Sequence, residues 1–427
     1  MSGARIVRFF VAALLLGSAT WTDAAEQGPA TGWQADPKLL AGLEARKTPY
    51  NYREAAVPKY ELPDPLVCTD GSRVTSSEQW EAKRRGETLE LFRRHVYGRT
   101  PKVDSVKFDV VETDARAIEG RATLKRVKIT SMQGEKAFAF EAAVLVPNVR
   151  KGRAPAFLLI NNRPVASADP TRREKNGFWP AEEIIARGYA TAVFRTSDVD
   201  PDRKDEAARA QGVRGAFTSP GRPDEDGWAT IAAWAWGASR VMDYLQTDPD
   251  IDGQKVAVIG HSRGGKTALW AGAEDPRFTL VISNDSGCGG AALSRRIFGE
   301  TVESINRAFP YWFCGNFKKF NGREEELPVD QHQLISLVAP RAVYVASADA
   351  DFWADQRGEF LSLVHAGPVH ALYGEKGMRA EEMPPLDTPL VRGRTGYHVR
   401  TGVHNLTPYD WKCFMDFADR LWGRERS

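Results

Sequence analysis

The sequence predicts an α/β fold in which a mostly parallel sheet lies between two layers of helices. Five short runs are continuous and mostly apolar, as in parallel strands buried on both faces: residues 156–160, 190–194, 256–259, 279–283 and 342–346. Helical patterns fall between these runs. The clearest pattern forms one apolar stripe from Trp228, Ile231, Ala235, Ala238, Met242 and Leu245. Strands that alternate with helices are typical of a doubly wound sheet.

Three strand-like runs precede the parallel part, at residues 106–112, 122–130 and 137–146. Apolar and polar residues alternate within them, and the turns between them suit antiparallel pairing. We therefore expect an antiparallel edge on the N-terminal side of the sheet. An amphipathic helix is expected before this edge, over residues 77–97.

The N-terminal residues have the pattern of a targeting segment. Arg5 and Arg8 precede an apolar run over residues 9–16, which is too short to span a bilayer, and small residues follow. This pattern predicts a Sec-type signal peptide over residues 1–24. We expect the mature protein to be periplasmic or secreted.

The rest of the chain, residues 25–427, has a length compatible with a single domain. Its first part, about residues 25–65, is rich in proline, alanine and polar residues without clear periodicity, so we expect an extended arm there. Two other long irregular stretches, residues 198–224 and 378–397, are expected to be loops over the functional face.

Composition and charge exclude several classes of function. The 58 basic and 56 acidic residues nearly cancel, which argues against a nucleic-acid partner or a membrane surface bound by bulk electrostatics. No apolar stretch beyond the signal segment approaches the length of a membrane span. The four cysteines contain no C-x-x-C pair, so a zinc site is not indicated, and their pairing stays open. Twelve tryptophans slightly favour a sugar substrate, because aromatic platforms are common in carbohydrate sites.

The strongest indication of function is a G-x-S-x-G sequence at residues 260–264, between a short apolar strand and a helical pattern. In the α/β-hydrolase fold this sequence forms a strained turn that exposes the hydroxyl of a nucleophilic serine. The backbone N–H of Arg263 would then point into an oxyanion hole, beside the positive end of a helix. The motif predicts an α/β-hydrolase fold, a three-layer sandwich with a mostly parallel central sheet and an antiparallel N-terminal edge. It also predicts Ser262 as the nucleophile.

The same segment matches the phosphate-binding P-loop pattern, through Gly260, Gly265, Lys266 and Thr267. Three observations favour the hydrolase interpretation. The signal peptide directs the chain to a compartment where ATP is scarce, several predicted strands precede the motif, and a downstream histidine would have no role. A turn with a purely structural role is the remaining alternative.

A nucleophilic serine needs a histidine base and a carboxylate that orients the base. In this fold they follow the serine in the order acid, then histidine. His404 lies in a loop directly before an amphipathic C-terminal helix, where the base belongs, and His398 is the second choice. Two acids compete. Asp285 follows the fourth buried strand and Asp351 the fifth; the fold in general favours the later position, but spacing alone leaves the choice open.

These residues resemble the glucuronoyl esterases, carbohydrate esterase family 15, and especially their bacterial members. The matching segments occur in order over the C-terminal half, at residues 260–266, 284–290, 298–301, 351–355 and 396–404. Together they are highly specific. The resemblance implies a serine esterase that acts through an acyl-enzyme on the ester between (4-O-methyl-)glucuronic acid of glucuronoxylan and lignin alcohols.

The resemblance also implies roles for individual residues. The family's usual acid is a glutamate at the position of Asp285, and some bacterial members carry a second acid at the position of Asp351, so Asp285 ranks slightly ahead. Arg263 would add its guanidinium to the oxyanion hole. The family's sugar-binding lysine, glutamate and tryptophan correspond to Lys266, Glu300 and Trp353.

The resemblance implies no metal or organic cofactor. The protein is expected to be a monomer, and its expected partner is a glucuronoxylan or lignin–carbohydrate ester. A disulfide found in fungal members would join the positions of His261 and Asn405, so that brace is absent here. An acetyl-xylan or general carboxylesterase of the same fold would not need the three sugar-binding residues and is the main alternative. A non-catalytic module that binds xylan is another.

Overall fold

The computed structural model describes residues 32–218, 225–378 and 382–424. The predicted signal peptide lies outside the described residues. Within the described part of the chain, no helix has the length and apolarity needed to cross a membrane. All four cysteines lie within the described residues, where each is buried and none forms a disulfide bond.

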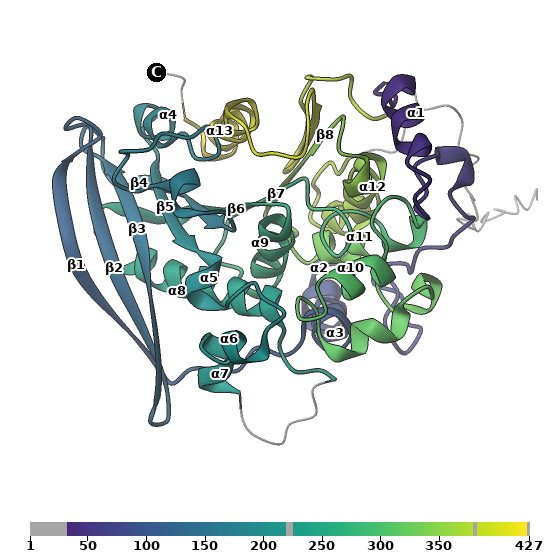
Figure 1. Ribbon diagram of the computed structural model, residues 1–427, viewed down its shortest axis with the longest axis horizontal. Helices are drawn as coiled ribbons and strands as arrows, with labels where there is room; N and C mark the ends of the chain where they lie inside the picture. Colours follow the sequence, from purple (N-terminus) through teal and green to yellow (C-terminus); the bar gives the residue numbers. More distant parts are fainter. Residues whose placement is uncertain (1–31, 219–224, 379–381, 425–427) are drawn as a thin grey trace, which may run out of the picture.

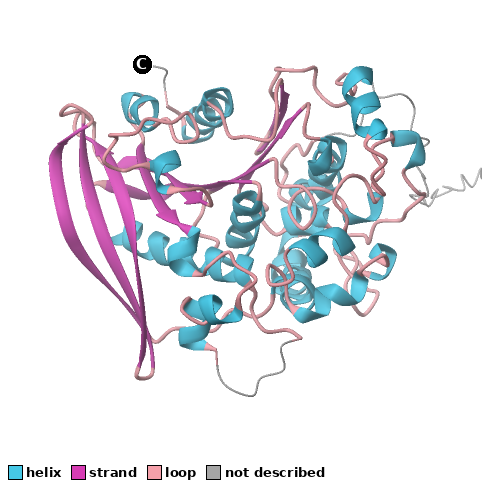
Figure 2. Cartoon of the chain, viewed as in Figure 1, coloured by secondary structure: helices cyan, strands magenta, loops and turns pink. Residues whose placement is uncertain are grey.

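In the described part of the chain, a mixed sheet of ten strands crosses the molecule (Figures 1 and 2). The order of its strands is β1-β2-β3-β5-β4-β6-β7-β8-β10-β9. The strands are β1 (Ser105–Ala117), β2 (Ala122–Gln133), β3 (Lys136–Pro147), β4 (Ala154–Asn161), β5 (Ala190–Arg195), β6 (Ile251–His261), β7 (Leu280–Asn284), β8 (Ala342–Ala348), β9 (Leu390–Arg392) and β10 (Thr395–Arg400). Strands β5 to β10 in this order pair in parallel, whereas β1, β2, β3 and the outer β9 pair antiparallel to their neighbours.

Helices cover both faces of the sheet and complete the three layers of an α/β-hydrolase fold. Figure 1 shows α4 (Ala181–Ala186) and α13 (Pro408–Trp422) on one side of the sheet. The other side carries α3 (Arg85–Phe92), α8 (Thr230–Thr247), α9 (Arg263–Glu274), α11 (Gln331–Ser336) and α12 (Gln356–Leu372). The other α-helices are α1 (Pro37–Ala45), α2 (Ser77–Gln79), α5 (Thr196–Val199), α6 (Glu206–Arg209), α7 (Val213–Phe217) and α10 (Val302–Ala308).

The continuous apolar runs form strands that are covered on both faces of the sheet, as their pattern predicts, and β4 is an example. All eight residues of β4 are buried. Leu158 and Ile160 belong to the core cluster beneath α8 and α9, and Phe157 and Leu159 to the cluster beneath α4 and α13. A strand covered on both faces is apolar at most positions, so it lacks the alternation of a half-exposed strand.

Several elements differ from the prediction in detail. The helix expected over residues 77–97 forms, but it includes two π-helical turns, η2 (Trp80–Arg84) and η3 (Arg93–Tyr97). The segment expected to be an extended arm contains α1, which begins at a proline after the N-cap Asp36 and buries none of its residues. The predicted loop 198–224 contains α6 and α7.

The largest difference is β10, whose first residues fall at the end of the predicted loop 378–397. It pairs in parallel with β8 and is buried throughout, yet it carries His398 and Arg400. Both side chains bind Asp410 of α13: His398 Nε2 lies 2.8 Å from Oδ1, and Arg400 Nε donates to Oδ2 at 2.8 Å. These polar side chains are buried because a residue on another element pairs with them. The sequence of the strand therefore lacks the continuous apolar pattern that would predict a buried strand.

Asp410 therefore connects the C-terminal helix to the strand that leads to His404. Replacing Asp410 by asparagine should lower the free energy of unfolding by about 3 kcal/mol, since it leaves the buried Arg400 guanidinium without its nearest charged partner. Urea unfolding at pH 7 measures this loss, with Asp109→Asn, a half-exposed carboxylate of β1 paired with Lys107, as the control. A loss below about 1 kcal/mol, the range of exposed ion pairs, would contradict the role of Asp410 as a buried charged partner of Arg400.

The pH dependence of this stabilisation follows from the pKa of Asp410. Burial alone would raise this pKa, but hydrogen bonding and charge from His398, and the Arg400 guanidinium, hold it below 3.8. A carboxyl group with a lowered pKa stabilises the folded state above its unfolded pKa of about 4, and this stabilisation is lost as the pH falls further. The difference in stability between wild type and Asp410→Asn should therefore narrow below about pH 4.

Candidate active site

Ser262 occupies a strained turn at the end of β6. Its backbone angles are φ 59° and ψ −126°, in a region that residues with a Cβ rarely adopt. The turn is held by hydrogen bonds on both sides: Ser262 N donates to Asn284 O at 2.8 Å, and Lys266 N donates to Ser262 O at 3.1 Å. A Cβ on Gly260 would lie 2.0 Å from the carbonyl oxygen of Gly264, so this tight approach requires glycine. The G-x-S-x-G turn thus has the geometry that its sequence predicts.

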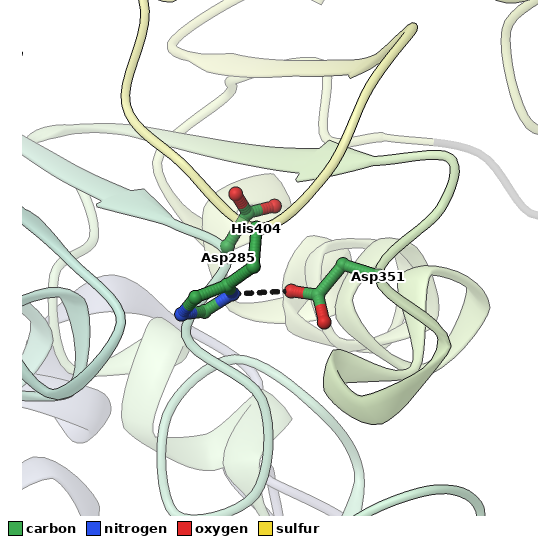
Figure 3. Close-up of side chains that lie close together, drawn as sticks. All are labelled: Asp285, Asp351 and His404. Carbon is green, nitrogen blue, oxygen red and sulfur yellow. Dashed lines mark hydrogen bonds and ion pairs between the residues drawn. The ribbon is translucent and has the colours of Figure 1, made fainter.

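His404 lies in the loop between β10 and α13, with its side chain about two-fifths exposed. Its Nδ1 is 2.5 Å from Oδ2 of the buried Asp351 (Figure 3). Since a carboxylate can only accept, Nδ1 carries the proton and Nε2 keeps its lone pair. Figure 3 shows this second ring nitrogen pointing away from both nearby carboxylates. The imidazole is therefore in the tautomer that a general base needs.

Asp285 lies close to this pair but has different partners. Ligand-capable atoms of Asp285, Asp351 and His404 all lie within 4.8 Å of one another. Oδ2 of Asp285 accepts weak hydrogen bonds from Asn405 N at 3.3 Å and Arg400 Nη2 at 3.5 Å. Burial, followed by the nearby charge of Asp351, raises the pKa of Asp285 well above its ordinary value. Asp285 thus contacts the backbone beside the histidine, whereas Asp351 contacts its ring.

A neutral histidine packs against the ring of His404. The two ring centroids of His261 and His404 are 4.4 Å apart. His261 Nδ1 lies 2.6 Å from Asn284 Oδ1, and its Nε2 lies 3.2 Å from Nη2 of Arg163, which can only donate. Burial, together with the charge that His404 can carry, holds the pKa of His261 well below its ordinary value. His261 is therefore an uncharged ring fixed by its neighbours.

The predicted residues meet around one cavity of about 170 Å³. Its lining consists of Ser262, Arg263, Lys266, Asp285, Ser286, Gly287, Glu300, Phe309, Trp312, Trp353, Ala354 and His404. Seven of the eight predicted site residues are in this lining, and the eighth, Asp351, binds His404 from behind. The cavity therefore combines the elements of a serine hydrolase with the three candidate sugar-binding residues.

Comparison with known proteins gives the family. A family model described as glucuronyl esterase of fungi matches residues 129–374. A promiscuous esterase of carbohydrate esterase family 15 from a marine bacterial metagenome shares 43% identity, with a TM-score of 0.78 over 87% of this chain and 99% of its own. The glucuronoyl esterase from Solibacter usitatus shares 39% identity, with a TM-score of 0.80 over 86% of this chain and all of its own. A 4-O-methyl-glucuronoyl methylesterase of Schizophyllum commune shares 30% identity over 74% of each chain.

The chain belongs to the glucuronoyl esterases of carbohydrate esterase family 15. It is a carboxylic ester hydrolase with an α/β-hydrolase fold. The membership argues against the P-loop and non-catalytic alternatives. Lys266 also lacks the arrangement of a P-loop lysine, because its ammonium contacts the segment after β7 rather than the turn at residues 260–264.

In this glucuronoyl esterase the ammonium of Lys266 is fully engaged. Nζ donates to the carbonyl oxygens of Ser286 and Cys288 at 2.5 and 2.6 Å, and it lies 3.5 Å from Oε2 of Glu300. An ammonium has three donors, so these contacts use all of them. Lys266 can therefore donate directly to sugar hydroxyls, as the resemblance implies, only if one of these three contacts breaks. Burial raises the pKa of Glu300, and the charge of Lys266 opposes this effect.

Trp353 borders the same end of the cavity. Its side chain is 36% exposed, unlike the fully buried tryptophans of the core. Its ring lies edge-on to Tyr50 from the N-terminal segment, with centroids 4.6 Å apart. The carbonyl oxygen of Trp353 accepts a hydrogen bond from Glu300 N at 3.1 Å, which ties the two residues together. An exposed ring held in this way offers a face or edge to a ligand in the cavity.

The sequence did not reveal the groups that surround Arg263 in the enzyme. Its guanidinium forms an ion pair with Asp202, in the stretch predicted to be a loop over the functional face. It also lies over the rings of Trp312 and Phe309. No local motif marks these residues, since none of them lies near the nucleophile in sequence. The one indication in the sequence was the prediction that residues 198–224, which include Asp202, form a loop over the functional face.

Proposed function

We propose that this enzyme hydrolyses esters of glucuronic acid, including its 4-O-methyl form. In this proposal Ser262 is the nucleophile, His404 the base and Asp351 the acid that orients the base. One observation carries the proposal: a single cavity is lined by Ser262 and His404 and also by the Lys266, Glu300 and Trp353 group. The names of the relatives from Solibacter usitatus and Schizophyllum commune support the same substrate class.

The reaction would proceed in two steps through an acyl-enzyme. His404 Nε2 takes the proton of Ser262 as Oγ attacks the uronate carbonyl, and Asp351 stabilises the imidazolium that results. The backbone N–H and guanidinium of Arg263 stabilise the tetrahedral oxyanion. The alcohol leaves with the proton held by His404. Water, activated by the same histidine, then releases glucuronate and restores the serine.

The sugar would bind at the end of the cavity formed by Glu300 and Trp353. The buried Glu300 carboxylate, held by Lys266, can accept hydrogen bonds from sugar hydroxyls. Trp353 supplies an apolar surface for the ring of the sugar. We further propose that the natural substrate is the ester between glucuronoxylan and lignin alcohols, and that the enzyme acts as an exported monomer.

The substrate assignment is tested by Trp353→Ala. With a benzyl glucuronate ester, KM should rise about tenfold, because an aromatic contact contributes about 1.5 kcal/mol. With an acetyl ester, which is too small to reach Trp353, kcat/KM should stay within about twofold, the scale of a surface substitution. Steady-state rates on both substrates measure the difference, with Val149→Ala at a fully exposed site as the control.

A general carboxylesterase is the second candidate. It is favoured by the description of the metagenomic relative as promiscuous and by the small volume of the cavity. Ligand pockets usually occupy about 300 Å³ or more. Faster turnover of acetyl than of glucuronate esters, together with equal effects of Trp353→Ala on both, would favour this second function over the first.

A further inference from the structure

A carboxylate from a distant segment holds the side chain that follows the nucleophile. Arg263 Nη1 forms an ion pair with Oδ2 of Asp202. The other oxygen of Asp202 accepts hydrogen bonds from Tyr311 OH and Trp312 Nε1, both at 2.8 Å. The ring of Trp312 also lies 4.7 Å from the guanidinium carbon of Arg263. Asp202 therefore joins Arg263 to the aromatic wall of the active-site cavity.

The backbone that carries Asp202 is itself anchored. Two residues earlier, the buried Asp200 accepts a hydrogen bond from Thr230 Oγ1 at 2.8 Å and pairs with Arg214 at 2.9 Å. The carbonyl oxygen of Asp200 accepts a hydrogen bond from Trp234 Nε1 at 2.8 Å. Since Thr230 and Trp234 belong to α8, the segment is tied to a core helix. The position of Asp202 is therefore set by packed structure.

We propose that Asp202 is a positioning residue for ester hydrolysis, acting through Arg263. It holds the guanidinium in one orientation at the cavity before the oxyanion forms. A long arginine side chain loses rotamer freedom when it binds, and a donor that is already oriented needs no reorganisation in the transition state. The inference rests on the proposed role of Arg263 in the oxyanion hole, and it adds a residue that no motif of the sequence indicates.

Removing the charge of Asp202 tests this role sharply, because the two possible effects of that charge would change kcat in opposite directions. If Asp202 orients Arg263, removing the carboxylate charge lowers kcat. If it only weakens the positive charge of Arg263, removing it strengthens the field at the oxyanion and raises kcat. Asp202→Asn separates these effects, since the amide keeps an oxygen that accepts from Tyr311 and Trp312 but loses the ion pair.

The experiment is a double-mutant cycle with a benzyl glucuronate ester as substrate. Arg263→Ala should lower kcat about 100-fold, the scale of one lost oxyanion donor. Asp202→Asn should lower kcat about tenfold with KM nearly unchanged, because a misplaced donor loses part of that effect. The double variant should be no slower than Arg263→Ala, since Asp202 acts only through that side chain. Asp198→Asn, an exposed carboxylate on the same segment paired with Arg195, is the matched control.

Tyr311→Phe provides a second variant that leaves both charges in place. It removes one hydrogen-bond donor to Asp202, so it should lower kcat in the wild-type background and have no effect in Arg263→Ala. An unchanged or raised kcat for Asp202→Asn would overturn the inference, as would an equal loss in both backgrounds. If Arg263→Ala itself keeps the wild-type kcat, the proposed oxyanion role fails first, and the positioning role fails with it.

Discussion

Replacing Ser262 by alanine should lower kcat on glucuronate esters by about 10⁶-fold, the scale seen when a serine nucleophile is removed from a triad. In the proposed mechanism this hydroxyl forms the covalent bond to the acyl group, so its removal abolishes the acyl-enzyme step. The residual rate should reflect substrate binding and the oxyanion hole alone. Initial rates at saturating substrate measure the effect, and a phosphonate probe should label the wild type but not the variant.

The fold should tolerate this substitution. The Ser262 side chain makes no capping hydrogen bond at the start of α9, and alanine keeps the Cβ that is already present in the turn. The urea midpoint of Ser262→Ala should therefore remain close to that of the wild type. Turnover that stays within about 1000-fold of the wild-type rate, far above the rate left by a loss of about 10⁶-fold, would indicate another nucleophile.

Replacing Asp351 by asparagine should lower kcat by about 10⁴-fold, because the amide changes the tautomer of His404. An amide nitrogen facing Nδ1 would favour a proton on Nε2, and such a ring cannot take the proton of Ser262. The present arrangement has Asp351 Oδ2 2.5 Å from Nδ1, which leaves Nε2 free. Rates of the wild type and Asp351→Asn with the same ester measure the loss.

Asp285→Asn is the matched comparison, since the two acids lie side by side and differ in their contacts. We expect a loss of about tenfold, the scale of a disturbed alignment rather than of a lost catalytic group. Asp285 Oδ2 accepts a hydrogen bond from Asn405 N rather than from the ring, and burial raises the pKa of Asp285, so a neutral amide should replace it with little change. A larger loss in Asp285→Asn than in Asp351→Asn would make Asp285 the orienting acid.

The parts of the fold that depend on local pattern could be predicted from the sequence. The apolar run at residues 156–160 lies within β4, Ala154–Asn161, because a strand buried on both faces must be apolar throughout. The turn at Ser262 was also evident, since its glycines are needed by contacts within a few residues, such as that of Gly260 with Gly264. Five short segments in the C-terminal half likewise indicated the family.

The parts that depend on contacts between distant residues could not be predicted. Strand β10 was missed because His398 and Arg400 are buried only through Asp410, which lies on another element. Asp202 was missed because its partner Arg263 lies 61 residues away in the chain.

The choice between Asp285 and Asp351 depends on the same kind of contact. Both acids follow a parallel strand, and both strands end at the edge of the sheet that carries the nucleophile. Spacing therefore places both carboxylates near His404 and cannot say which one reaches Nδ1. The sequence by itself determined the fold class, the family and seven of the residues that line the cavity. Only the tertiary structure decided which carboxylate faces the imidazole, because a hydrogen bond depends on side-chain direction to within a fraction of an ångström.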